Sequence, residues 1–166
     1  MQIVALTNEL VPSAQRLVDR VFPHQSLSEQ WSFWAYTRKR SLLIRLGLPL
    51  FGVKDLSTFW GAVDEGTDEV IATTGLYSCL RDAKEAVWLA WFCVAPERRG
   101  AGIGTMMLDF SIERARETGK RFFRLYTSDA PNEATAQHLY EKKGFTIVGV
   151  SKKRPYNKIY REKLLE

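Results

Sequence analysis

The chain has 166 residues, of which 45% are hydrophobic and 26% are charged. These values are typical of a folded globular protein and exclude an intrinsically disordered chain. The length suits one domain with a core of its own, so we expect a single domain over residues 1–166.

The sequence carries no signal for a membrane, an export pathway or a metal. No apolar run approaches the roughly 20 residues that a membrane-spanning helix needs, and residues 1–7 lack the pattern of a signal peptide. Cys79 and Cys93 lie in apolar, strand-like runs, where reduced packing residues are the simplest interpretation. His24 and His138 have no metal-ligand partners at a suitable spacing. We expect a cytoplasmic protein with no metal and no membrane partner.

The net charge of +5 is modest. No nucleic-acid-binding motif appears, so we expect no nucleic-acid partner. A basic nucleic-acid-binding domain is a distant alternative, which steeply salt-dependent binding to oligonucleotides would reveal. The basic cluster of Arg38, Lys39, Arg40 and Arg45 is interpreted as a solvated helix face, or else as a surface that attracts an acidic acceptor or a phosphate group.

Periodicity and turn residues predict an alternation of strands and helices along the chain. Strands are expected at 2–7, around 59–63, and at 70–80, 86–94, 121–127, 145–150 and 157–163. Helices are expected at 12–22, from a capping segment at 26–29 to about 46, from 103 to before Gly119, and at 131–144. This order predicts an α/β domain in which helices cover a mixed sheet.

The most informative stretch begins with an unbroken apolar run at residues 86–95, which Pro96 closes. Because the run is apolar at every position, we expect a strand buried on both faces. Gly100, Gly102 and Gly104 follow, and a helical pattern then begins at Ile103. A glycine-rich turn leading into a helix exposes main-chain N–H groups beside the positive end of the helix dipole, which suits a phosphate or pyrophosphate.

The glycine pattern differs from two common phosphate-binding motifs. A P-loop requires a lysine after its last glycine, but Thr105 follows Gly104 here. A dinucleotide-binding fingerprint requires a glycine at the position of Thr105. The stretch from Arg99 to Gly104 instead resembles the signature [QR]-x-x-G-x-[GA] of the GCN5-related N-acetyltransferases (GNAT). Val94 and Pro96 match residues that usually precede this signature.

A second match supports the resemblance. Residues 139–145, Leu-Tyr-Glu-Lys-Lys-Gly-Phe, resemble the L-Y-x-K-x-G-F segment of the same family. The resemblance is strong in the C-terminal half and covers the first half only through the order of elements. It implies a mixed, mostly antiparallel central sheet flanked by helices. It also implies an acetyl-CoA-dependent N-acetyltransferase that acts by direct attack of a primary amine on the thioester.

The resemblance assigns roles to particular residues. Main-chain groups of Phe92, Cys93 and Val94 would pair with the pantetheine arm of acetyl-CoA, with the Phe92 N–H facing the thioester carbonyl. Tyr140 would be the general acid for the departing thiolate. The remaining contacts to acetyl-CoA would come from Arg99, Gly100, Ala101, Gly102, Ile103, Gly104, Thr105 and Asn132.

The sequence does not supply an obvious general base. Some members of the family carry a glutamate four residues before the position of Phe92, where this chain has Trp88. Glu85 and Asp129 are nearby carboxylates, but each reads more simply as a solvated turn residue. The amine could also lose its proton through a water relay or bind already neutral. Both alternatives agree with the sequence, so no side chain is assigned as the base.

The acceptor is expected to be a small-molecule or peptide amine. Trp31, Trp34 and Tyr77 are candidates for its pocket, although most aromatic residues of the chain are expected in the core. The resemblance also allows for a homodimer, because members of the family often dimerise. The principal alternative is a domain that binds acyl-CoA without catalysis and acts as a sensor or interaction module. The lack of a carboxylate at Trp88 favours that alternative.

Overall fold

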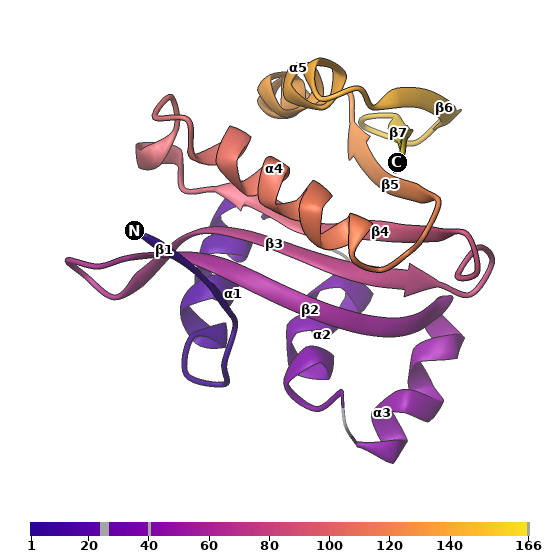
Figure 1. The fold of residues 1–166 in the computed structure, drawn as a ribbon, viewed down its shortest axis with the longest axis horizontal. Helices are drawn as coiled ribbons and strands as arrows, with labels where there is room; N and C mark the ends of the chain where they lie inside the picture. Colours follow the sequence, from indigo (N-terminus) through magenta and orange to yellow (C-terminus); the bar gives the residue numbers. More distant parts are fainter. Residues whose placement is uncertain (24–26, 40, 166) are drawn as a thin grey trace.

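A twisted sheet runs through the molecule, with helices on both of its faces (Figure 1). The computed structural model describes residues 1–23, 27–39 and 41–165. Within them the sheet has seven strands in the order β1-β2-β3-β4-β5-β7-β6, and every neighbouring pair is antiparallel except β4 and β5. The strands are β1 Gln2–Ala5, β2 Val53–Asp64, β3 Glu69–Cys79, β4 Ala86–Val94, β5 Phe122–Ser128, β6 Thr146–Ser151 and β7 Lys158–Leu164.

The helices form two layers around the sheet. Helix α4 crosses one face, and α1 and α2 lie against the other (Figure 1). The α-helices are α1 Val11–Val21, α2 Leu27–Thr37, α3 Leu42–Gly47, α4 Ile103–Arg116 and α5 Ala134–Lys142. The 3-10 turns are η1 Leu48–Phe51, η2 Pro96–Arg98 and η3 Pro131–Glu133. None of the described helices is both long and apolar enough to cross a membrane.

Buried side chains gather in two clusters, one under each helix layer. The first joins α1 and α2 to β2 and β3, with Val18, Phe33 and Phe59 almost fully buried. The second joins α4 and α5 to β4 and β5, around Leu108 and Phe123. The central strand β4 contributes to both clusters, as the apolar run predicts.

Two elements differ from the sequence prediction. The single helix expected up to residue 46 is wrong, because α2 ends at Thr37 and α3 begins after Ser41. Short turns close the end of α2, and Ser41 has an extended backbone with φ −67° and ψ 134°. Lys39 donates to the Ser57 carbonyl of β2 and lies over the Tyr36 ring, so the predicted solvated face does not include this side chain. His24, Ser26 and Arg40 lie outside the described residues.

The second difference concerns β2. The sequence predicts only a short strand around residues 59–63, but β2 is continuous from Val53 to Asp64. Its pairing with β3 shifts register three times, which breaks the strict alternation of apolar and polar residues that the prediction relied on. Its first residues therefore read as a loop in the sequence.

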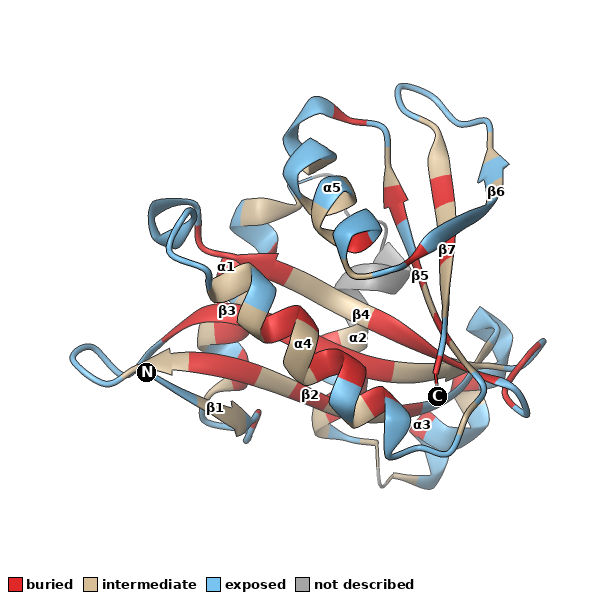
Figure 2. Cartoon of the chain, turned by 45° about the horizontal axis from the view of Figure 1, so that its top comes forward, coloured by how far each residue is buried: buried red, intermediate tan, exposed pale blue. Residues whose placement is uncertain are grey.

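Strands β4 and β5 separate after a short parallel contact. They pair only at Ala86–Trp88 and Phe122–Arg124. Beyond this base, β5 and β7 rise away from β4 (Figure 2). At the base, the Arg124 guanidinium binds Asp82 at 2.7 Å, Glu162 at 2.6 Å and Glu85 at 3.0 Å. Burial alone would lower the Arg124 pKa, but these hydrogen bonds more than offset it, so its pKa is raised and the cation is permanent.

Gly75 on β3 has no room for a side chain, because the Phe59 ring of the neighbouring strand β2 lies beside it. A Cβ atom at this position would lie 3.0 Å or less from three ring atoms of Phe59. The Phe59 ring cannot shift freely, because it stacks on Tyr36 at 4.5 Å and meets Phe33 edge-on at 5.6 Å.

We expect Gly75→Ala to lower the free energy of unfolding by about 1–3 kcal/mol, as overpacking of a filled core does. Denaturant unfolding would measure the change. Gly47→Ala is the matched control, because a Cβ there has no atom within 4 Å. In a Phe59→Leu background the cost of Gly75→Ala should shrink, and an unchanged cost would show that the ring is not the obstacle.

Candidate functional site

The loop between β4 and α4 presents a run of unused main-chain donors. Within the described chain, the N–H groups of residues 100–105 have no hydrogen-bond acceptor, and the first intramolecular bond of the helix starts at Met106, which donates to the Gly102 carbonyl at 3.1 Å. No side chain caps the helix either. These donors lie at the positive end of a 14-residue helix, which is a favourable place for an anion.

Two glycines give this loop its shape and keep it open. Gly100 and Gly102 both have φ +80°, a left-handed conformation that other residues adopt at a cost. A Cβ built on either would have no atom within 4 Å, so the space above the loop is open. An open space ringed by unpaired N–H groups fits a pyrophosphate. Gly104 is different, since its φ is not left-handed and a Cβ there would make ordinary contacts of 3.7 Å with Leu139 and Val94.

Side chains around the loop hold it to the sheet. Arg98 binds Asp64 at the end of β2, and Arg20 on α1 binds Glu97 at 2.9 Å. The Arg99 Nε donates to the Val94 carbonyl at 3.2 Å. These contacts fix the loop to β2, α1 and β4, while the main-chain N–H groups of residues 100–105 stay unpaired.

A β-bulge in β4 decides which side chains face the split between the strands. Thr73 pairs with Cys93 and Gly75 with Ala90, so Trp91 and Phe92 together stand opposite one residue of β3. Trp91 has φ +49° and turns its ring toward α2, where the indole N–H donates to Ser32 at 2.7 Å.

Because of this extra residue, Phe92 reaches the α5 side of the sheet, and its ring lies 5.8 Å from that of Tyr140. The bulge has no signal in an all-apolar run, so sequence reasoning missed it.

The end of β4 keeps one free edge. The Ala95 N–H donates to the Ile71 carbonyl of β3 at 2.8 Å, so Ala95 faces β3. Main-chain groups alternate along a strand, so those of Val94 point to the opposite side, toward the gap that β5 leaves, where its carbonyl accepts the Arg99 hydrogen bond and its N–H has no partner from β5. This free edge lies beside the loop donors, as expected for capture of an extended ligand by strand addition.

Tyr140 is buried where α5 closes over the split. Its ring lies between those of Phe92 and Phe145, each at 5.8 Å, and only 5% of the residue is exposed. Burial, with Glu133 and Cys93 nearby, raises the pKa of its hydroxyl far above the usual value, and Arg161 offsets this only in part. The hydroxyl forms no hydrogen bond with another described residue, and its oxygen is not among the fully buried atoms without a partner, so it keeps some contact with solvent. It is therefore a protonated donor without an acceptor in the described protein.

Cys93 is also close to this point but is inert. Its thiol lies 3.2 Å from the Thr73 hydroxyl, and burial raises its pKa to about 11. The thiolate is the nucleophilic form of cysteine. At neutral pH the side chain of Cys93 is therefore a packing group, as the sequence predicts.

Asn132, another predicted site residue, lies in the 3-10 turn that precedes α5. Asn132 is exposed in η3. Its neighbour Glu133 is the residue that joins η3 to β5, since it accepts hydrogen bonds from Thr127, from the Ser128 hydroxyl at 2.5 Å and from the Ser128 N–H at 3.1 Å.

The carboxylates considered as bases are all engaged elsewhere. Glu85 pairs with Arg124 at 3.0 Å, and Asp129 accepts from the main chain and side chain of Asn157 at 2.8 and 2.7 Å. The Trp88 indole N–H donates to both oxygens of the buried Asp82 at 3.0 Å. Where some family members carry a glutamate, this chain therefore has an indole held by an ion-paired aspartate.

Tyr77 belongs to a pocket that the sequence does not reveal. Tyr77 pairs with Trp88 in register across β3 and β4, and Tyr126 pairs with Tyr160 across β5 and β7. The Trp88 and Tyr160 rings meet edge-on at 6.4 Å, which joins the two pairs. The pocket has a volume of about 330 Å³ and its further lining residues are Phe51, Gly52, Cys79, Leu80, Arg81 and Lys158.

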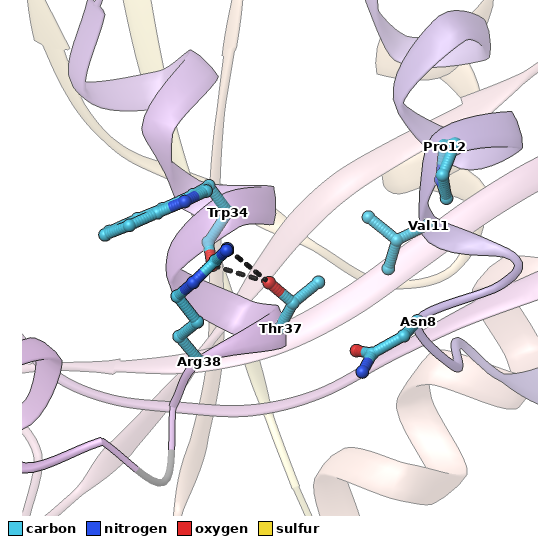
Figure 3. A pocket seen from close by; sticks show the side chains of 6 residues that line it. All are labelled: Asn8, Val11, Pro12, Trp34, Thr37 and Arg38. Carbon is cyan, nitrogen blue, oxygen red and sulfur yellow. Dashed lines mark hydrogen bonds between the residues drawn. The ribbon is translucent and has the colours of Figure 1, made fainter.

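The structure does not bring Trp34 to this pocket. Trp34 is 43% exposed and lines a separate hollow of about 470 Å³ between the start of α1 and the end of α2 (Figure 3). There the Arg38 guanidinium lies 4.7 Å from the centre of the Trp34 ring. The side chain of Trp31 lies outside the described part of the chain.

Comparison with known proteins agrees with this geometry. The model of the acetyltransferase (GNAT) domain family matches residues 55–147, and the chain belongs to that family. A curated relative, GCN5-related N-acetyltransferase 6, chloroplastic, of Arabidopsis thaliana, is 40% identical over 65 residues. The match covers 39% of this chain and 22% of that protein, so the chain spans well under half of this relative.

Solved structures share the fold at low identity. An acetyltransferase of the GNAT family from Staphylococcus aureus Mu50 has a TM-score of 0.72 at 16% identity, with 99% of each chain covered. A GNAT family acetyltransferase from Elizabethkingia anophelis, with acetyl-CoA bound, has a TM-score of 0.68 at 19% identity and covers 99% of this chain and 97% of that one. The predicted fold class is confirmed.

Replacement of Gly102 should block the open space above the loop. We expect Gly102→Val to weaken binding of coenzyme A by more than about tenfold, because a branched side chain would stand among the donors. Isothermal titration calorimetry would measure the affinity. Gly119→Val is the matched control, since Gly119 also has a left-handed φ and open surroundings but lies at the far end of α4. Equal losses in both variants would assign the effect to backbone strain alone.

Cys93 should resist thiol reagents in the folded protein. With a pKa of about 11, about one part in a thousand of this thiol is ionised at pH 8. We expect mass spectrometry to find Cys93 unmodified after incubation with iodoacetamide at pH 8, and fully modified after unfolding in urea. Rapid modification in the native state would show a reactive thiolate.

Proposed function

We propose that the protein is an acetyl-CoA-dependent N-acetyltransferase that transfers an acetyl group to a primary amine. The observation that carries the proposal is the row of unpaired N–H groups from Gly100 to Thr105 at the start of α4. The acetyl-CoA bound to the relative from E. anophelis supports the same ligand class for this chain. When bound, acetyl-CoA supplies the acetyl group in activated form, as a thioester.

The main chain does most of the proposed binding. The N–H groups of residues 100–105, Ile103 among them, would hold the pyrophosphate, with Arg99 and Asn132 at the margin. At the free edge of β4, main-chain groups of Phe92 and Val94 would pair with the pantetheine arm, and the Phe92 N–H would stabilise negative charge on the carbonyl oxygen. Cys93, between them, pairs with Thr73 of β3, so its main chain would not take part. Separation of β4 from β5 leaves room for this arm.

Tyr140 is the proposed general acid. In the transfer, a bond would form between the amine nitrogen and the acetyl carbon as the carbon–sulfur bond breaks, and the Tyr140 hydroxyl would give its proton to the leaving sulfur. The nitrogen would lose one proton to water as the amide forms, and water would return a proton to the Tyr140 phenolate. A phenol with a raised pKa is a weak acid in water. The same burial, however, also destabilises a thiolate and makes it a stronger base, which offsets the raised pKa of the phenol.

No side chain is assigned as the base, since Glu85 and Asp129 are engaged in ion pairs and hydrogen bonds. The amine would therefore arrive neutral or lose its proton through water. The proposed acceptor pocket is the aromatic one that contains Tyr77. Transfer would be direct, because the Cys93 thiol is buried and protonated.

One experiment separates this enzyme from a domain that only binds acyl-CoA. The purified protein would be incubated with acetyl-CoA and a panel of amines that includes polyamines, amino acids, aminoglycosides and peptides, and release of free thiol would be measured. Transfer to at least one amine is expected. Tight binding of acetyl-CoA without thiol release on any amine would instead support a non-catalytic sensor or interaction domain.

Tyr140→Phe should lower turnover by about 10²–10⁴-fold while leaving the affinity for acetyl-CoA unchanged, because it removes a proton donor and no binding contact. The melting temperature should change little, since the hydroxyl has no partner to lose. Tyr36→Phe is the control, because Tyr36 is a buried tyrosine of the other core cluster whose hydroxyl donates to Leu6. Unchanged turnover in Tyr140→Phe would remove the assignment.

The pH dependence gives a second check on Tyr140. An acid is active in its protonated form, and the raised pKa keeps Tyr140 protonated up to and beyond pH 10. Turnover at saturating substrates should therefore show no fall between about pH 7 and pH 10. A fall with its midpoint in this interval would point to an acid with a lower pKa.

A further inference from the structure

Large apolar side chains are exposed together on α3 and η1. Over this short segment the exposed fractions are 68% for Leu42, 81% for Leu43, 66% for Leu46, 86% for Leu50 and 53% for Phe51. We call these five residues the α3–η1 ridge. Such a contiguous apolar surface is uncommon on a protein without a partner and marks a site of interaction.

The ridge is held firmly rather than loosely attached. Ile44 and Leu48, on the inner side of the same segment, are buried in the core cluster that contains Phe59. Gly52 accepts a hydrogen bond from the Leu80 N–H at 2.9 Å, which fastens the end of η1 to the end of β3. The inner residues fix the segment, so the outer ones are presented at defined positions.

In the sequence, the net positive charge of the chain falls in the segment that contains this ridge. Residues 38–54 contain five lysines and arginines and no acidic residue. The remaining 19 basic residues are balanced by 19 acidic ones, so the rest of the molecule is formally neutral. Arg38, Arg45 and Lys54 are exposed, and none of them forms an ion pair with a side chain that the structure describes.

We propose that the α3–η1 ridge docks the protein on a bilayer surface that carries anionic lipids, with the leucines in the acyl boundary and the cations at the headgroups. A short amphipathic element with apolar and basic groups is suited to this position. The proposal departs from the expectation of no membrane partner, which rested on the lack of a spanning segment.

The shape and charge of the segment favour a bilayer over another protein. Helix α3 lies at the edge of the molecule, away from the centre of the sheet (Figure 1), and Leu42, Leu43 and Leu46 are exposed on it. A fluid bilayer accepts such a surface without a complementary pocket. A second copy of the chain would bring two sets of exposed cations together, each with Arg38, Arg45 and Lys54, which like-charge repulsion disfavours.

Docking in this way would also orient the aromatic pocket. Phe51 and Gly52 belong to the lining of that pocket, next to Tyr77 and Tyr160. The mouth of the pocket would then lie close to the lipid headgroups. This orientation does not depend on the proposed acetyl transfer, and the binding test below needs no enzyme activity.

The test is sedimentation of the full chain with vesicles. One set contains equal parts of phosphatidylglycerol and phosphatidylcholine, and the other contains phosphatidylcholine alone. We expect binding to the anionic vesicles that weakens as salt rises from about 0.05 to about 0.5 M. The variant Leu43→Gln/Leu46→Gln/Leu50→Gln should lower the partition coefficient by more than about tenfold, and Arg45→Gln/Lys54→Gln by about fivefold for each cation removed.

Matched controls change similar residues elsewhere on the surface. Ile147→Thr/Val150→Thr removes exposed apolar groups from β6, and Lys152→Gln/Lys153→Gln removes two exposed cations. Both controls should bind vesicles as the unchanged protein does, and melting temperatures would verify that every variant is folded. The proposal fails if the protein does not bind anionic vesicles at low salt, or if the ridge variant binds as well as its control.

A protein–protein role for the ridge is a separate outcome. Light scattering after size exclusion would give the mass of the chain without lipid. A dimer that the ridge variant, but not the β6 control, converts to a monomer would overturn the membrane proposal in favour of self-association.

Discussion

The ionic cluster around Arg124 is the constraint on which the site depends. Two parallel strands that pair at only three positions would close or drift apart if nothing fixed the place where they meet. Arg124 fixes this junction, because one permanent cation on β5 binds Asp82 and Glu85 before β4 and Glu162 on β7. Trp88 adds its indole N–H to the same Asp82. The strands can then separate beyond Trp88 by a defined amount, and this separation makes room for a ligand between the free edge of β4 and the α5 side.

The same arrangement gives Trp88 a structural role, so its position in the chain need not supply a catalytic base. In this chain the position belongs to the ionic cluster and to an aromatic pocket, so it holds the sheet together and shapes a surface. Tyr140, the proposed proton donor, lies on the other side of the split, where burial keeps the phenol protonated. In the proposed mechanism, cofactor binding, structural support and proton transfer are thus divided among the loop before α4, the junction of β4 and β5, and α5.

Much of the fold, with the elements that carry the candidate site, could be predicted from the sequence, because those features have local signals. An unbroken apolar run, glycines before Ile103 and the segment around Tyr140 mark a buried strand, an open turn and a helix. The features that could not be predicted depend on contacts between distant residues. The bulge at Trp91 is invisible in an apolar run, and Tyr126 meets Tyr160 only through the register of β5 and β7. The break before Ser41 was hidden because residues 38–40 are acceptable in a helix.

The loop with Gly100 and Gly102 also has a thermodynamic consequence. Its donors are main-chain groups whose positions are fixed when the protein folds, since η2, Arg98 and the start of α4 hold them on either side. The conformational entropy of ordering this recognition element is therefore lost during folding and not during association. A diphosphate that arrives meets a preorganised surface, and the association rate should be limited by diffusion and orientation rather than by rearrangement of the loop.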